Sequence, residues 1–147
     1  MAIEVQNTKI VRAIDLQTLA DATAAEIEVD SRGFHHARFV FLTGAVAATS
    51  NISVAKIQSA ATSGGAKTDV SGALLANGTI SAASTSSDTM HAIDVDLTDK
   101  SIGQFLSVVL TGSVAANIDI AVFCILSRNN APVTTAAEAG FVSLVSA

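Results

Sequence analysis

Residues 42–55 have the sequence LTGAVAATSNISVA, and residues 110–121 have the sequence LTGSVAANIDIA. When Thr49 and Ser50 are left out, the two copies align with three differences. Each copy is flanked by apolar runs rich in β-branched residues and Phe, at 39–42 and 52–58 in one case and at 105–110 and 118–126 in the other. A strand, a loop of small residues with a glycine, and a second strand indicate a β-hairpin. We therefore predict two equivalent hairpins at the heart of one antiparallel β domain; the alternative is a chance likeness of two segments rich in Ala, Val, Thr and Ser.

The composition favours a closely packed β structure over an enzyme. The chain has 147 residues, enough for one domain, and half of them are hydrophobic, with six Phe but neither Trp nor Tyr. Only 14% are charged, whereas about 25% is usual. Because an enzyme cleft needs convergent polar and titratable groups, we expect no enzymatic activity and no cofactor.

Charge and hydropathy argue against nucleic acid and membranes as partners. The net charge is −5, and the eight basic residues are scattered along the chain, so no basic patch is predicted. The most apolar segment, Phe105 to Leu126, contains Asn117 and Asp119 and is interrupted at Gly112. That pattern fits strands rather than a transmembrane helix. The first residues lack the basic and apolar regions of a signal peptide, so none is expected.

Residues 1–25 are predicted to form an N-terminal arm. A short strand is expected at Lys9–Ile14, followed by one or two helical turns at Asp15–Asp21 with Asp15 as N-cap. Residues 129–147 are predicted to form a C-terminal tail that ends in the apolar segment 141–145. Exposed apolar surface is unfavourable by ~25 cal/mol per Å², so both arms should be buried, by adding a strand to the body's sheet or to a neighbouring subunit.

Residues 26–128 are predicted to form the body. Hydrophobic and polar residues alternate at 25–30 and at 91–97, as in half-buried strands, whereas 37–43 is apolar on both faces apart from Arg38. The stretch 59–89 is a long loop rich in Ser, Thr and Ala, with room for short strands at 68–70 and 79–81. Strands about every ten residues, without an amphipathic helix, indicate a β-sandwich. The expected fold is all-β: an antiparallel, jelly-roll-like β-sandwich with extended N- and C-terminal arms. The expected core includes Val40, Leu42, Leu106, Val108 and Leu110.

The histidines do not suggest a metal site. His35 and His36 are adjacent and should point to opposite faces of a strand, and His91 lies elsewhere. A metal would require two of them to converge with a carboxylate. We therefore predict no metal-binding residue.

Two other groups of residues are not expected to form a site. Asp94, Asp96 and Asp99 resemble a fragment of a calcium loop that lacks its central Gly and terminal Glu, so a solvated strand face is the better interpretation. Cys124 lies in a strand-like run and is expected to be a small buried hydrophobe. No catalytic or cofactor-binding residue is predicted.

The pattern of hydrophobic positions and turns across residues 8–134 resembles a known group. The resemblance is carried by KIVRAID, RGF, ARFVFLTGAV, QFLSVVLT and AVFCILSR, at 9–15, 32–34, 37–46, 104–111 and 121–128, with Pro132-Val133 after them. This pattern is similar to that of small structural proteins of tailed bacteriophages, some of which are head decoration, or cement, proteins. The long loop at 59–89 and the Ala-rich tail depart from that group.

The resemblance implies a non-enzymatic capsid decoration or cement subunit on the virion surface, made in the host cytoplasm. Its expected partners are the major capsid protein and further copies of itself, with a homotrimer favoured. The alternative is a phage tail or fibre-associated module that contacts host surface glycans. A sugar platform usually presents exposed Trp or Tyr, and this chain has neither, which favours the capsid role.

Overall fold

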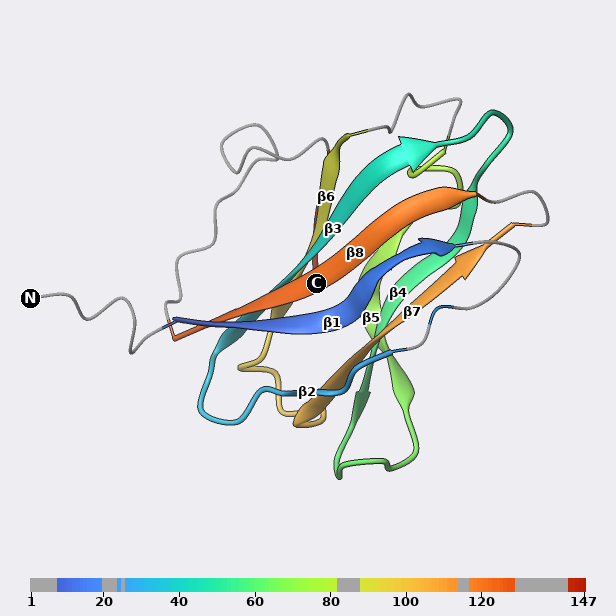
Figure 1. The fold of residues 1–147 in the computed structure, drawn as a ribbon. Helices are drawn as coiled ribbons and strands as arrows, with labels where there is room; N and C mark the ends of the chain where they lie inside the picture. Colours follow the sequence, from blue (N-terminus) through green and yellow to red (C-terminus); the bar gives the residue numbers. More distant parts are fainter. Residues whose placement is uncertain (1–7, 20–23, 25, 82–87, 114–116, 129–142) are drawn as a thin grey trace, which may run out of the picture.

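The computed structural model describes residues 8–19, 24, 26–81, 88–113, 117–128 and 143–147 (Figure 1). These residues form nine strands and no helix, so the predicted all-β class is confirmed. The strands are β1 (Thr8–Leu19), β2 (Val29–Asp30), β3 (His36–Val46), β4 (Ile52–Ala60), β5 (Thr68–Leu75), β6 (Met90–Asp96), β7 (Phe105–Gly112), β8 (Ile118–Ser127) and β9 (Ser143–Ser146).

The strands form two sheets that pack face to face as a β-sandwich. One sheet has the order β1-β8-β3-β6-β9, and the other has the order β2-β7-β4-β5. The first eight strands are therefore distributed over two four-stranded sets, as in a jelly roll. All the strand pairs are antiparallel except β6 and β9, which run parallel. The predicted jelly-roll-like sandwich is present, with one parallel strand added at an edge.

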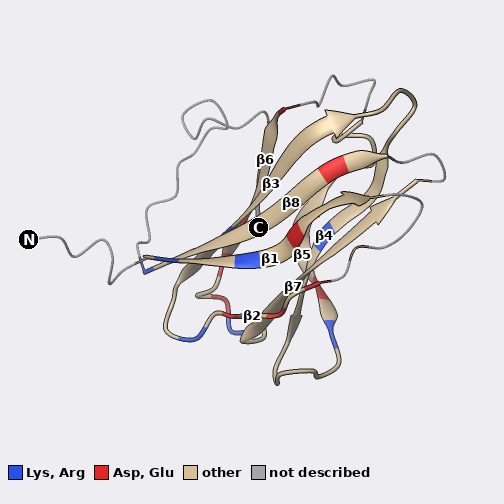
Figure 2. Cartoon of the chain, viewed as in Figure 1, with Lys and Arg blue, Asp and Glu red and all other residues tan. Residues whose placement is uncertain are grey.

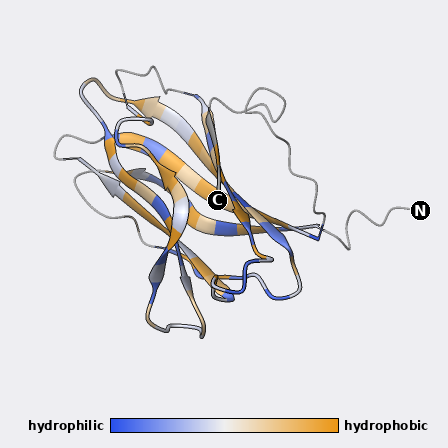
Figure 3. Ribbon diagram, turned by 180° about the vertical axis from the view of Figure 1, so that it is seen from behind, coloured by the Kyte–Doolittle hydropathy of each residue, from blue (hydrophilic) through white to orange (hydrophobic). Residues whose placement is uncertain are grey.

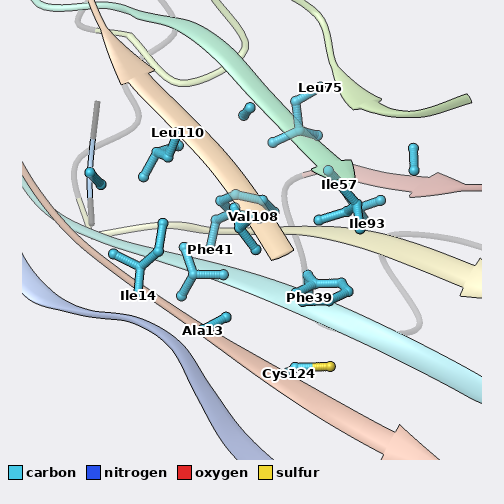
Figure 4. Packing of buried hydrophobic residues seen from close by; sticks show 14 of the residues in the cluster. Ala13, Ile14, Phe39, Phe41, Ile57, Leu75, Ile93, Val108, Leu110 and Cys124 are labelled. Atoms are coloured by element: carbon cyan, nitrogen blue, oxygen red, sulfur yellow. The ribbon is translucent and has the colours of Figure 1, made fainter. Parts of the chain in front are cut away.

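The core lies between the two sheets and is built from alternate residues of each strand (Figure 4). Phe39 and Phe41 of β3 are its largest side chains, and both are fully buried. Viewed from the other side, the strands carry most of the hydrophobic colour and many loops are hydrophilic (Figure 3). Burial of each large apolar side chain contributes about 1.5–3 kcal/mol. Facing residues include Ile14, Ile93 and Cys124 from the larger sheet and Ile57, Leu75, Val108 and Leu110 from the smaller one.

The repeated stretch forms corners between the sheets, and the predicted hairpins are wrong. One copy connects β3 of the larger sheet to β4 of the smaller, and the other connects β7 of the smaller sheet to β8 of the larger. Strand β3 already pairs with β6 and β8, so it has no free edge for β4. The copies nevertheless lie at equivalent places, because Leu42 is opposite Ala121 and Leu110 is opposite Ala55.

Of the five predicted core residues, Leu106, Val108 and Leu110 lie in the core, whereas Val40 is buried outside it and Leu42 is exposed. Val40, Leu106, Val108 and Leu110 are at most 1% exposed, whereas Leu42 is 44% exposed. The inward positions of β3 are taken by the two phenylalanines, so Val40 and Leu42 face the other way. Because side chains alternate along a strand, equivalent positions in the repeat do not guarantee equivalent faces.

Thr8–Leu19 is an integral strand, in contrast to the expected arm with helical turns. It pairs with β8 from Thr8 opposite Ser127 to Leu19 opposite Ile118, with two irregularities in register on the way. Ala13, Ile14 and Leu19 belong to the core. Pairing along the whole of β8 outweighs a weak local preference for helix, so the sandwich is not confined to 26–128.

The tail also joins the body. Ser143–Ser146 adds a parallel strand to β6, with Ser143 opposite His91, as one of the two expected arrangements requires. The N–H of Ala147 donates to the carbonyl of Asp94, and the N–H of Asp96 donates to the carbonyl of Ala147, both at 2.8 Å. The parts of both expected arms at 1–7, 20–23, 25 and 129–142 lie outside the described residues.

Two further predictions are refined by the structure. The strand expected at 25–30 is limited to Val29–Asp30, and the N–H of Ile27 instead donates to the carbonyl of Ala13 at 2.8 Å. In the long loop, the short strand expected at 68–70 extends over Thr68–Leu75. At 79–81, where a second short strand is expected in this loop, the structure has an isolated β-bridge between Ser81 and Asn51.

Candidate functional site

The three histidines lie in three separate environments. The Nδ1 atom of exposed His35 is 3.2 Å from the carbonyl oxygen of Arg128. His36 lies on β3, where burial lowers its pKa. His91 is 1% exposed, its Nε2 atom is 3.2 Å from Oγ1 of Thr89, and burial lowers its pKa as well. Across the part of the chain that the structure describes, no three His, Cys, Asp or Glu side chains are placed to hold a metal ion.

Asp94 is buried in an ion pair, which corrects the prediction that it lies on a solvated face. The guanidinium of Arg38 donates from Nε to Oδ1 and from a terminal nitrogen to Oδ2, both at 2.6 Å. The two residues lie opposite each other on β3 and β6. Their side chains are 15% and 3% exposed. The hydrogen bonds to the carboxylate raise the pKa of Arg38.

His36 is the third member of this cluster. Its Nε2 atom is 3.7 Å from Oδ2 of Asp94 and is buried without a hydrogen-bond partner. The carboxylate of Asp94 is already engaged by Arg38, so a proton on His36 would bring a second positive charge into a partly buried site. The cluster therefore favours neutral His36 and holds β3 and β6 in register.

The other two aspartates of the calcium-like fragment are exposed, as predicted. Asp96 accepts hydrogen bonds from the N–H and hydroxyl of Thr98, and these lower its pKa. Asp99 accepts from the N–H of Ser101 at 2.8 Å, and its pKa is lowered too. These carboxylates order the turn that follows β6.

Cys124 is fully buried, as predicted. It lies on β8 among core residues, and burial raises its pKa far above the ordinary value. A thiol that stays protonated is neither a nucleophile nor a metal ligand. Its role is packing.

A polar cleft of about 420 Å³ lies where the free edge of the smaller sheet approaches β6 and β9. The sequence does not predict it, because its walls come from four separate parts of the chain, at 59, 68–71, 96–102 and 147. The carboxylate of Asp69 accepts hydrogen bonds from Lys56 and Gln58, each at 2.7 Å, which lower its pKa. The lining residues are Ser59, Thr68, Asp69, Val70, Ser71, Asp96, Asp99, Ser101, Ile102 and Ala147.

The cleft offers hydrogen-bonding groups without an evident nucleophile or base. Its three carboxylates each accept hydrogen bonds from neighbouring protein groups, and no histidine or cysteine lines it. Such a surface can recognise polar groups through hydrogen bonds. Charged residues elsewhere are also spread thinly over the strands and gather near the loops around β2 (Figure 2).

Comparison with known proteins adds no relative. No protein-family model, no curated protein and no solved structure matches the chain. Among the described residues there is also no helix long and apolar enough to span a membrane.

Proposed function

We propose that this chain is a non-enzymatic virion structural protein, a capsid decoration or cement subunit. In this role it binds the major capsid protein at the capsid surface as a homo-oligomer, with a trimer favoured, after synthesis in the host cytoplasm. The observation that carries the proposal is the combination of a jelly-roll sandwich, a fold common in viral capsid proteins, with large hydrophobic side chains left exposed on two strands of its larger sheet, Ile10 and Leu16 on β1 and Leu42 on β3. The proposal agrees with the resemblance of residues 8–134 to phage structural proteins.

The physical demands of that role fit the molecule. A cement subunit must resist deformation, and this chain places Phe39, Phe41 and Leu110 in a core between two sheets, each fully buried. Both segments expected to be arms contribute strands, β1 and β9, to the body. A rigid body with apolar surface left over can bind other subunits with little loss of conformational entropy.

The test is reconstitution with heads assembled from a tailed-phage major capsid protein. Heads assembled without the chain should bind it when it is added, should show a repeating density for it by cryo-electron microscopy, and should withstand higher temperature. Properly assembled heads that neither bind the chain nor gain stability would refute the proposal.

The second candidate is a tail or fibre-associated module that contacts host glycans. The polar cleft, lined by Asp69, Asp96, Asp99 and four hydroxyl side chains, favours it, and jelly rolls also occur in lectins. The cleft has no aromatic side chain on which a sugar ring could stack, so the capsid role is preferred. Binding on a glycan array that Asp99→Asn abolishes would reverse this order.

A further inference from the structure

The turn that follows β5 places an asparagine directly before a glycine. Asn77 and Gly78 are the central residues of a β-turn in which the N–H of Thr79 donates to the carbonyl of Ala76 at 3.0 Å. The φ of Gly78 is +83°, and that of Asn77 is not positive, as in a type II turn. The side chain of Asn77 is exposed. The turn accounts for the glycine, and it also exposes two groups that can react with each other.

The reaction is attack of the backbone nitrogen of Gly78 on Cγ of Asn77. The nitrogen loses its proton and bonds to Cγ, the bond from Cγ to the side-chain nitrogen breaks, and ammonia leaves, which closes a succinimide ring. Water then opens the ring to give aspartate or isoaspartate. A side chain on the following residue hinders the attack, and glycine has none. Asn77 is the only asparagine of the chain that precedes a glycine, whereas Asn51 and Asn117 precede isoleucines.

Both reacting groups are held by residues at the point where β4 begins. Nδ2 of Asn51 donates to Oδ1 of Asn77 at 2.8 Å, and the N–H of Gly78 donates to the carbonyl of Ile52 at 3.3 Å. A Cβ added to Gly78 would lie 3.8 Å from Oδ1 of Asn51, so the amide of Asn51 lies against both residues. The attack needs the side chain of Asn77 to turn toward a nitrogen whose proton is engaged elsewhere, so both hydrogen bonds have to open first.

We propose that Asn77 is a site of spontaneous deamidation and that Asn51 restrains the reaction in the folded chain. Opening of an exposed turn is a low-energy local event, so the restraint slows the reaction without abolishing it. Each product adds a negative charge, and no lysine or arginine occurs in the segments 39–55 and 68–81 to offset it. The isoaspartate product also lengthens the main chain by a methylene group, so the turn and the hydrogen bond to Ile52 cannot re-form as before.

The experiment incubates the full chain in mildly alkaline buffer and follows each asparagine by peptide mapping with mass spectrometry. Aspartate and isoaspartate should accumulate at position 77, while Asn51 and Asn117 stay intact as internal controls. The same chain unfolded in guanidinium chloride should react faster, because both hydrogen bonds are absent. Asn51→Ala should speed the reaction in the folded chain roughly 2- to 10-fold, the equivalent of one net hydrogen bond. Asn117→Ala is the matched control: Asn117 is also exposed, and its loss should leave the rate at Asn77 unchanged.

Far-UV circular dichroism and the denaturation midpoint check that each variant is folded. Asn51→Asp keeps the shape of the side chain but cannot donate to Oδ1 of Asn77, so it replaces Asn51→Ala if that variant is not folded. If Asn77 stays intact in the folded Asn51 variants while it reacts in the unfolded chain, the proposed site is wrong. Equal rates in the folded and unfolded chains, or Asn51 variants that react no faster than Asn117→Ala, would overturn the restraint. None of these outcomes depends on binding to heads.

Discussion

Truncating Leu110 and Leu42, which are equivalent in the repeat, should have very different effects on stability. Leu110 is fully buried between the sheets, whereas Leu42 is 44% exposed. Leu110→Ala removes the whole burial of a leucine side chain and leaves a cavity, so it should cost roughly 2–5 kcal/mol. Leu42→Ala loses about half of that burial and opens no closed cavity, so about 1 kcal/mol or less is expected.

The assay is urea denaturation with linear extrapolation of the free energy of unfolding. For a chain of this size, the expected loss for Leu110→Ala corresponds to a fall of roughly 5–20 °C in Tm. Because self-association raises apparent stability, the midpoints should be compared at protein concentrations low enough that they no longer change with dilution. Equal losses for the two variants would show that the facing assigned to β3 and β7 is wrong.

Three further predictions concern polar contacts and the tail. Arg38→Ala should lower the free energy of unfolding by about 3 kcal/mol, because it leaves the buried carboxylate of Asp94 without the guanidinium that pairs with it. The double variant Arg38→Met with Asp94→Leu should recover much of that loss, and urea denaturation measures both. His91 has a lowered pKa in the folded state, so the unfolded state binds more protons and stability should fall as pH drops below about 6.5. His91→Gln should flatten that decline between pH 7 and pH 5, and an unchanged slope would contradict the assignment. Deleting 143–147 should leave a folded sandwich with a lower denaturation midpoint and faster hydrogen exchange at β6, because β6 loses its parallel neighbour; undiminished protection there would refute it.

The all-β class and most strand positions could be predicted from the sequence, because alternation of apolar and polar residues is a local signal with period two. The same signal correctly placed Val108 and Leu110 in the core and Cys124 among buried residues. It could not decide between a hairpin and a corner at the repeat. That choice depends on which strand edges are free, and β3 is flanked on both sides by strands distant in the chain.

The candidate sites could be predicted even less well from local sequence patterns. Arg38 and Asp94 are fifty-six residues apart and pair only because β3 and β6 adopt one register. The polar cleft likewise joins segments that are brought together by sheet order. The apolar residues near the N-terminus were all expected to be buried. Ile14 and Leu19 are buried in the core, whereas Ile10 and Leu16 are exposed. A sequence determines which side chains avoid water, but only the tertiary structure decides which of them are left facing it, since each strand has one face toward the core.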